Sequence, residues 1–515
     1  MNIQPKAWLA VAGIAALTAT AGATTAVAQM QDETLRVVTR GLNESRGRPD
    51  QGVQSPASFW NWPIYDSLTM VDLDGNAQPL LATGWETVDD ETWRFTLRPN
   101  VRFQNDEPFT ADAVVQDIEY AINGEGKGTT SGRNMRTQAR IASIRKLDDL
   151  TIEIKTAGPN PILPKAISGN FIPAPKAYAD QGNAGFANNP IGTGSYRLVE
   201  WNAEGSKLEA FAGSWRPAKI KNLAITAVPE RSTRVQAIVS DQADIAIGLS
   251  IDNIDTIEGA GHQIGAFPRP SVMAWQFMST LPDSPFRDQR VRLAANLAID
   301  RNVLNDELLR GLSRPANQCA AHFAFGYNPN IPQYAFDPAR AKQLLAEAGY
   351  PDGFDVTAEV VPGAQTGDNE IYQAVAQQLS AVGIRVKLEG ITFGVFLKKW
   401  FPGADATRLG FENLFQNYCN DNNVDGLDAF SNSSCRKNPP YYCDQDEMKL
   451  IDAAASEFDE DKRRKAINDL LALNHENAGG LYMVEVIDVA GVHKRVKGFK
   501  NIIQRLNYHE VTIEE

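Results

Sequence analysis

The chain has 515 residues, of which 43% are hydrophobic and 22% are charged, a composition typical of an ordinary globular protein. At about 100–200 residues per domain, this length predicts two or three domains, each with its own core. A net charge of −13 repels phosphate backbones and anionic lipid surfaces, so we predict that the protein binds neither nucleic acid nor a membrane surface.

The N-terminal residues 1–28 are typical of a secretory signal peptide. Lys6 precedes a short, mostly apolar run, Ala7–Leu17, and the small residues that follow end in Ala-Val-Ala at 26–28, an A-x-A cleavage pattern. The apolar run is shorter than the ~20 residues that cross a bilayer, and no cysteine stands at the cleavage point. We therefore predict a cleaved signal peptide and a periplasmic protein without membrane insertion. An ordinary N-terminal core helix is the alternative.

Two aromatic segments are candidates for ligand contacts. Phe59 and Trp60 stand in a run of aromatic residues where a loop becomes a helix, and Trp275 and Phe277 share one face of an alternating, strand-like stretch. Ligand pockets are mostly apolar and aromatic with a few placed polar groups, so we predict that these four residues contact the ligand. Three aromatic residues at such a junction are unusual for a plain core, whereas ordinary core packing explains the stretch around Trp275 at least as well.

The first half of the chain predicts short strands and one well-marked helix. Residues 34–39 are rich in β-formers, and Trp93–Leu97 alternates apolar with polar residues, as a half-buried strand does. Thr110 is expected to cap a helix that runs to Ile122. Five prolines within residues 159–175 exclude a long regular element there.

The second half predicts α/β layers. Apolar residues recur with helical period from Val291 to Ile299, and Asp337, followed by a proline, is a helix N-cap. Residues 355–361, 369–382 and 384–388 predict a strand, a helix and a second strand. A strand–helix–strand unit joins two neighbouring parallel strands by a right-handed crossover. The fold class is therefore predicted to be α/β.

The four cysteines predict two disulfide bonds. An exported chain with an even number of cysteines favours disulfides, although four cysteines allow three connectivities. We favour Cys435–Cys443 and Cys319–Cys419, which in the chain-entropy model stabilise by roughly 2–3 and 4–5 kcal/mol. Four buried free thiols are the alternative.

No motif identifies the chain as an enzyme. The sequence lacks G-x-S-x-G, H-E-x-x-H and G-x-G-x-x-G, and Gly192–Gly194 is only a fragment of the last motif. The five histidines are scattered, and Cys319 and His322 have a metal-like spacing without a second close pair. We predict no catalytic residue, no metal site and no cofactor.

A polar, turn-forming stretch follows Tyr418 and Cys419. Asp421 within it, held near the predicted disulfide of Cys419, is suited to pair with an ammonium group of a ligand. We therefore predict that Tyr418 and Asp421 contact the ligand. A surface turn rich in Asn and Asp explains the same residues.

Four segments resemble the large periplasmic peptide-binding proteins of ABC importers, the oligopeptide, dipeptide and nickel type known as bacterial extracellular solute-binding protein family 5. Residues 93–115 are similar to the strand, turn and "PFTADDVV" helix of the family, and residues 189–198 to its "NPIGTGPYRL" signature. Residues 284–301 resemble its "PFDDVRVRQAL…AIDR" helix, and residues 337–353 its "EAGYPDGF" segment. Ser195 replaces the usual proline of the signature, a departure at a position that belongs to the fold.

The resemblance implies a two-lobed periplasmic-binding-protein fold with mixed sheets, an extra small domain and a hinged cleft between the lobes. The implied boundaries are 31–64, 190–283 and 486–515 for lobe I, 65–189 for the small domain and 284–485 for lobe II.

The resemblance also implies the function. The protein would be a monomer that captures a peptide or other small molecule between its lobes and delivers it to an inner-membrane ABC permease. Cys419-Asn420-Asp421 is similar to the "C-A-D" stretch of peptide binders, whose aspartate holds the α-ammonium group, which favours a peptide. A nickel chelate, glutathione, an opine or an oligosaccharide are the alternatives within the family, and a periplasmic hydrolase is the alternative outside it.

Overall fold

The structure is a computed structural model of the whole chain. It describes residues 30–41, 45–51, 57–400, 411–420, 423–432, 435–436, 440–503 and 505–514. The predicted signal peptide lies outside these residues, and so does Asp421. Within the described part, none of the helices combines the length and the apolar character that a bilayer crossing demands.

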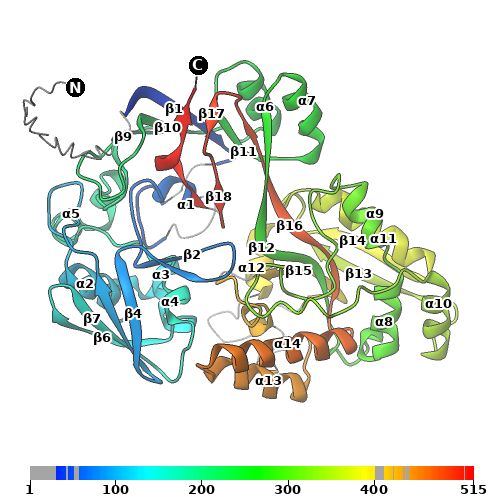
Figure 1. Cartoon of the computed structure of the whole chain (residues 1–515). Helices are drawn as coiled ribbons and strands as arrows, with labels where there is room; N and C mark the ends of the chain where they lie inside the picture. The colour runs from blue at the N-terminus through cyan, green and yellow to red at the C-terminus, as the bar shows by residue number, and fades with distance from the viewer. Residues whose placement is uncertain are drawn as a thin grey trace, which may run out of the picture.

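A mixed sheet of ten strands runs through the described part of the molecule and joins its two ends (Figure 1). From one edge to the other, the strands are β14 (Ile384–Gly390), β13 (Phe354–Val360), β15 (Leu414–Asn420), β12 (Gln263–Phe277), β16 (Leu481–Val492), β11 (Ile245–Leu249), β1 (Gln31–Thr39), β10 (Ile220–Ala227), β9 (Gly205–Ala210) and β8 (Tyr196–Trp201). β1 is parallel to β10 and β11, and β13 is parallel to β14 and β15, whereas β12 and β16 are antiparallel to each other.

Two long strands, β12 and β16, belong to both ends of this sheet (Figure 1). Their pairing runs from Gln263↔Val492 to Pro268↔Ile487, shifts register, and resumes at Val272↔Glu485. Proline has no N–H to donate to a ladder, so Pro268 and a second proline two residues later place this break in the middle of β12. The break divides the end that pairs with β11 from the end that pairs with β15. We refer to these ends as lobe I and lobe II, with the boundaries predicted above, which stay a prediction.

Lobe II contains the predicted strand–helix–strand unit. β13 and β14 are parallel neighbours, with Phe354 opposite Ile384, and α11 (Asp368–Ala381) connects them. Helices α8 (Gln289–Leu297), α9 (Arg301–Asp306), α10 (Pro338–Glu347) and α11 pack on one face of the sheet, and α13 (Gln445–Ser456) and α14 (Glu460–Glu476) pack on the other. The Asp337 carboxylate accepts a hydrogen bond from the Arg340 main-chain N–H and caps α10 as predicted.

A second, antiparallel sheet forms the small domain, with the order β4 (Ala82–Asp89), β5 (Thr92–Leu97), β7 (Thr151–Thr156) and β6 (Ile141–Asp148). Helix α2 (Ala111–Ile122) begins directly after Thr110 and ends where the sequence predicted. Among the described residues, the proline-rich segment 159–175 holds only the one-turn helix α4 (Leu163–Ala166) and the first residue of α5 (Pro175–Asn188). Figure 1 shows this domain beside lobe I and across from lobe II.

Candidate functional site between the lobes

A hairpin near the C-terminus reaches the place where lobe I, lobe II and the small domain meet. It consists of β18 (Asn501–Ile502) and β19 (Arg505–Leu506) and follows the last pairing of β16 (Figure 1). Ile503 at its tip packs against the apolar cluster of lobe II that contains Phe325. Arg505 donates from Nη2 to the carbonyl oxygen of Ser168 in the small domain, at 2.6 Å. The hairpin therefore contacts all three units.

Arg505 is a half-buried cation that lacks an anionic partner within the described residues. Its guanidinium lies 4.9 Å from the ring of Trp62, and its Nη1 atom is buried without a hydrogen-bond partner in the described structure. Arg216 lies over the same ring at 5.0 Å, but it forms an ion pair of 2.6 Å with the fully buried Asp66. Burial, and next the charge of Arg216, lower the pKa of Arg505 to about 10. The arrangement favours an incoming anion at Arg505.

Further polar atoms lie buried without partners near the break in β12. They are Ser271 Oγ and Arg269 Nε on β12 and Asn501 Oδ1 on the hairpin, each without a hydrogen bond inside the described segments. Phe267 of β12 and Phe499 before the hairpin are in contact, with ring centroids 5.5 Å apart. An unsatisfied buried polar atom costs about 1–3 kcal/mol. Donors and acceptors of this kind at a junction between lobes are typical of groups that a ligand completes.

An ion cluster links the small domain to lobe II. Asp425 is fully buried and accepts two hydrogen bonds from Arg463 of α14, at 2.7 and 2.8 Å. Lys165 of α4 approaches the same carboxylate at 3.4 Å and lies over the ring of Phe325 at 4.6 Å. Burial raises the pKa of Asp425, but the charges of Arg463 and Lys165 outweigh it and hold the pKa below its ordinary value. Lys165 therefore adds a charged contact between the small domain and lobe II.

The two predicted disulfides are both present. Cys319 and Cys419 are bonded with their Cα atoms 5.1 Å apart, and Cys435 and Cys443 with theirs 4.6 Å apart. Because Cys419 belongs to β15, the first bond anchors the end of that strand to the loop around residue 319. The stretch that contains Asp421 begins directly after this anchor.

Four predicted ligand contacts lie in packed cores. Trp275 and Phe277 are fully buried on the sheet face that α8–α11 cover, where Trp275 lies 5.7 Å from Tyr372 between ring centroids. Phe59 and Trp60 are buried in the core that lobe I shares with the small domain, and the Trp60 indole donates to the Gly41 carbonyl oxygen at 3.2 Å. These contacts correspond to the packing alternative, and a role in ligand binding stays a prediction.

Tyr418 and Asp421 are the two remaining predicted contacts. The backbone of Tyr418 lies in β15 opposite Met273, while its side chain, like all of Asp421, is outside the described residues. Sequence reasoning missed Arg505 and Lys165, because neither belongs to a motif. Trp62, which lies against Arg505 in the structure, belongs to the aromatic run around Trp60 that the sequence did mark.

Residues 76–418 match the sequence profile described as "Bacterial extracellular solute-binding proteins, family 5 Middle". The chain belongs to this family. The Glutathione-binding protein GsiB of Salmonella typhi is 27% identical over 338 residues, and the match spans 64% of this chain and 64% of the relative's own length.

Solved structures with the same fold support the two-lobed architecture. The periplasmic binding protein DppA from Helicobacter pylori, in complex with the peptide STSA, has a TM-score of 0.77 at 21% identity, covering 94% of this chain and 99% of that one. AgaA from A. tumefaciens R10, in complex with agropinic acid, has a TM-score of 0.74 at 21% identity, with the same two coverages. The predicted fold, an α/β protein with two lobes and mixed sheets, is confirmed.

Proposed function

We propose that this protein is the extracytoplasmic substrate-binding component of an ABC importer and captures a small peptide between its lobes. It releases the peptide, chemically unchanged, to an inner-membrane permease, and it works in the periplasm after its signal peptide is removed. The observation that carries the proposal is the half-buried Arg505, which lacks an anionic partner among the described residues at the meeting point of the three units. Membership of the solute-binding family supports it.

The shared strands supply the hinge of this mechanism. β12 and β16 continue through both lobes, and the register break around Pro268 is the point at which they bend most easily. A ligand closes the lobes only if it binds the closed form more tightly than the open form. It must therefore contact both lobes when they are closed and one lobe when they are open.

The charges of a peptide fit the groups at the junction. Arg505 is positioned to receive a carboxylate of the ligand, and the predicted role of Asp421 is to receive its α-ammonium group. Each ion would cost several kcal/mol to bury alone, so the two pairings together select a ligand that carries both charges. Main-chain hydrogen bonds to an extended peptide would add affinity without side-chain specificity.

Calorimetry on the mature protein with a panel of di- to pentapeptides tests the proposal. We expect Arg505→Gln and Asp421→Asn each to weaken binding of the best peptide at least tenfold, or about 1.4 kcal/mol. Arg385→Gln is the matched control, because Arg385 forms an exposed ion pair with Asp355 within lobe II and its loss should leave the affinity unchanged. Circular dichroism checks that each variant is folded. Unchanged affinity in both test variants, or recovery of a cleaved peptide, contradicts the proposal.

Glutathione is a second candidate ligand, favoured by similarity to the glutathione-binding proteins GsiB, which are 27% identical to this chain. It is itself a short peptide with carboxylates and an ammonium group, so it satisfies the same pairings. Native mass spectrometry of the protein as purified, followed by calorimetry with glutathione and with an ordinary tripeptide, separates the two. Binding of glutathione at least tenfold tighter than any α-linked tripeptide would establish it as the ligand.

A further inference from the structure

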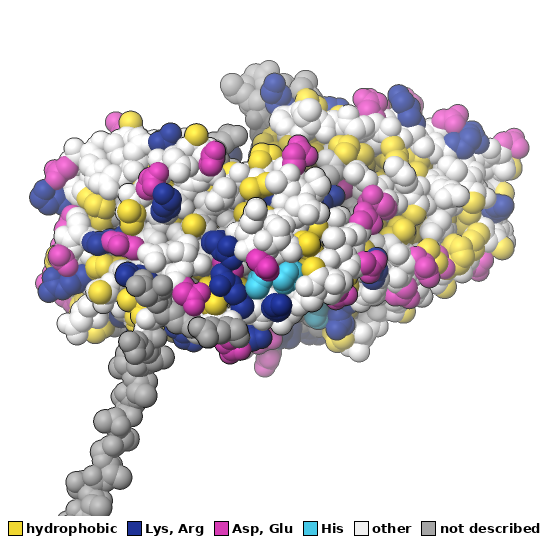
Figure 2. Space-filling view, turned by 90° about the horizontal axis from the view of Figure 1, so that it is seen from above, with side chains coloured by type: hydrophobic (Ala, Val, Ile, Leu, Met, Phe, Trp, Pro, Cys, Tyr) yellow, Lys and Arg dark blue, Asp and Glu magenta, His cyan; other side chains and the backbone are white. Residues whose placement is uncertain are grey.

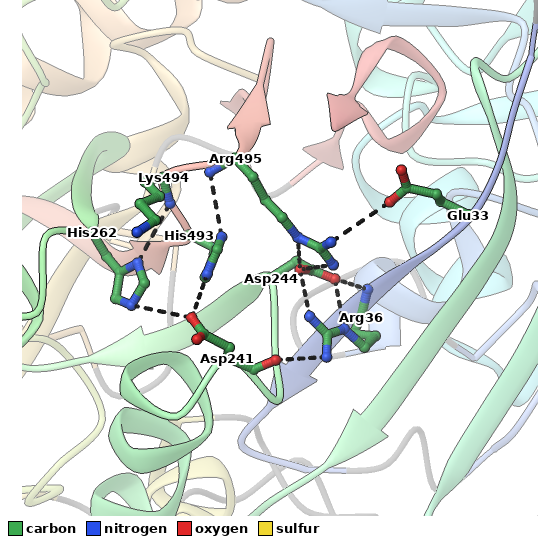
Figure 3. Close-up of polar contacts among 8 residues, drawn as sticks. All are labelled: Glu33, Arg36, Asp241, Asp244, His262, His493, Lys494 and Arg495. Carbon is green, nitrogen blue, oxygen red and sulfur yellow. Dashed lines mark hydrogen bonds and ion pairs between the residues drawn. The ribbon is translucent and has the colours of Figure 1, made fainter. Parts of the chain in front are cut away.

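Three side chains from distant parts of the chain meet on lobe I (Figure 3). Asp241 follows α6 (Arg231–Val239), His262 precedes β12, and His493 follows β16. His493 Nε2 lies 2.6 Å from Asp241 Oδ1, and His262 Nε2 lies 3.9 Å from the same oxygen. One ligand atom of each residue lies within 4.8 Å of the other two.

The fold dictates this meeting. Gln263 of β12 pairs with Val492 of β16, so the next residues outward, His262 and His493, lie side by side with their ring centroids 4.4 Å apart. Asp241 has a left-handed backbone, φ 58°, which an aspartate adopts more readily than most residues, and its carboxylate points toward the two rings (Figure 3). Both histidines are buried, whereas the Asp241 side chain is 72% exposed. Figure 2 shows histidine side chains reaching the surface on the upper face of the molecule, beside lysines and arginines.

We propose that Asp241, His262 and His493 form a binding site for a divalent transition-metal ion such as Zn²⁺. Imidazole nitrogen and carboxylate oxygen are donors that Zn²⁺ prefers, at bond lengths of about 2.0–2.2 Å. Donors around a tetrahedral ion then lie about 3.3 Å apart, a value between the shortest and the longest separation in this cluster. The exposed side of Asp241 leaves the fourth position open to water.

The surrounding charges permit a cation to bind at this cluster, but they do not favour high affinity. Arg36 and Arg495 are close, but both form ion pairs with the buried Asp244, at 2.9 and 2.7 Å. Lys494 is exposed, and its positive charge acts on His262 and Asp241. Its ammonium group therefore opposes a second cation nearby. Removal of this charge should strengthen metal binding.

The second contact of each ring limits the affinity as well. Metal-bound histidines usually donate their other N–H to an acceptor, which orients the ring. Here Nδ1 of His262 faces the Lys494 main-chain N–H at 3.5 Å, and Nδ1 of His493 faces the Arg495 main-chain N–H at 3.3 Å. These contacts direct both Nε2 atoms toward Asp241, but they must lengthen when a metal takes the Nε2 position. Loss of such support costs about 10–100-fold in affinity, so we expect micromolar binding.

Such an ion would join the loop after α6 to the lobe I ends of β12 and β16. These are the two strands that continue into lobe II, so the metal would brace the base of the hinge. It should raise the thermal unfolding temperature without changing the affinity for the transported ligand. The site does not depend on the proposed function, and its test uses no peptide.

Equilibrium dialysis of the tag-free mature chain against Zn²⁺, with bound metal measured by mass spectrometry, tests the proposal. We expect about one Zn²⁺ per chain at micromolar free metal, and no Mg²⁺, because Mg²⁺ prefers oxygen ligands. His262→Gln, His493→Gln and Asp241→Asn should each weaken Zn²⁺ binding at least tenfold. His322→Gln is the control, because His322 pairs with Glu485 on lobe II and should leave the Zn²⁺ affinity unchanged.

A fourth variant keeps the test decisive if the buried histidines prove necessary for folding. Lys494→Gln changes an exposed residue, and we expect it to tighten Zn²⁺ binding at least twofold. Nuclear magnetic resonance of ¹⁵N-histidine in the unaltered chain should show Zn²⁺ shifting the signals of two histidines and sparing the other three. A Zn²⁺ dissociation constant above about 1 mM overturns the proposal. So does Zn²⁺ binding that is abolished in His322→Gln but retained in His262→Gln and His493→Gln.

Discussion

Two buried aspartates, Asp244 and Asp425, are held by guanidinium groups in similar ways. Asp244 is paired with Arg36 of β1 and with Arg495 just beyond β16, all within lobe I. Asp425 is paired with Arg463 of lobe II at 2.7 Å and with Lys165 of the small domain at 3.4 Å. Both aspartates are completely buried.

The difference lies in what each pair connects. The Asp244 cluster connects segments that all belong to lobe I and would move together, so its ion pairs contribute to stability. In the proposed mechanism, the Asp425 cluster joins two units that separate on opening, so water replaces part of its ion pairing in the open form. The same chemistry would then serve stability in one place and conformational change in the other, because one cluster has a partner from another unit.

The largest effect is expected from Asp244→Asn. It leaves two arginines without their carboxylate, and since these are partly exposed we expect a loss of about 2–4 kcal/mol in the free energy of unfolding. Burial acts to raise the pKa of Asp244, but Arg36 and Arg495 hold it below the ordinary 3.8. Its contribution is thus present above pH 4 and is lost as the pH falls through the lowered value. Urea titration measures the loss, and a change in ligand affinity would contradict a purely structural role.

A smaller effect with the opposite pH dependence is expected beside Asp425. Burial, and next the charge of Asp425, raise the pKa of Asp428 from 3.8 to about 7, while Arg463 and the Asn423 amide oppose the rise. The folded state then holds more protons than the unfolded state between about pH 4 and 7, so stability falls as the pH rises through this window. Asp428→Asn should remove this slope and add about 1–2 kcal/mol at pH 7.5. Urea titrations at pH 5 and 7.5 provide the measurement, and a slope that persists in the variant excludes Asp428 as its source.

The smallest effect on stability and the most specific effect on conformation are expected from Lys165→Met. Lys165 is partly solvated, so we expect it to contribute less than about 1 kcal/mol to folding. Without its ammonium group, the small domain loses an attachment to lobe II. Small-angle scattering should show a larger radius of gyration for the ligand-free variant, and ligand affinity should fall several-fold. An unchanged radius together with unchanged affinity would make Lys165 merely structural.

Local patterns predicted much of the fold. The apolar spacing around Val291 predicted α8, and alternation with helix-capping residues predicted β13, α11 and β14 as a parallel unit. These signals exist because each element buries one face, so apolar residues recur along the sequence with the period of the helix or strand. The presence of disulfides followed from export and the even number of cysteines, and the favoured pairing is the one observed.

Long-range relations could not be obtained in this way. The alternation around Trp275 showed that β12 has two apolar faces, but not that both are covered, one by α8–α11 and the other by α13 and α14. Arg505 is one arginine among many in the sequence, and only tertiary structure places it beside Trp62 and Ser168. His262 and His493 stand 231 residues apart, so no spacing rule could join them.

The position of β16 in the large sheet has a consequence for biogenesis. This strand is translated long after β11 and β12, yet it lies between them and is paired with both. A chain cut short before residue 481 would leave β11 and β12 with open edges, and neither half of the sheet could be completed. The native sheet therefore waits for β16, and the earlier strands remain exposed to aggregation until it arrives.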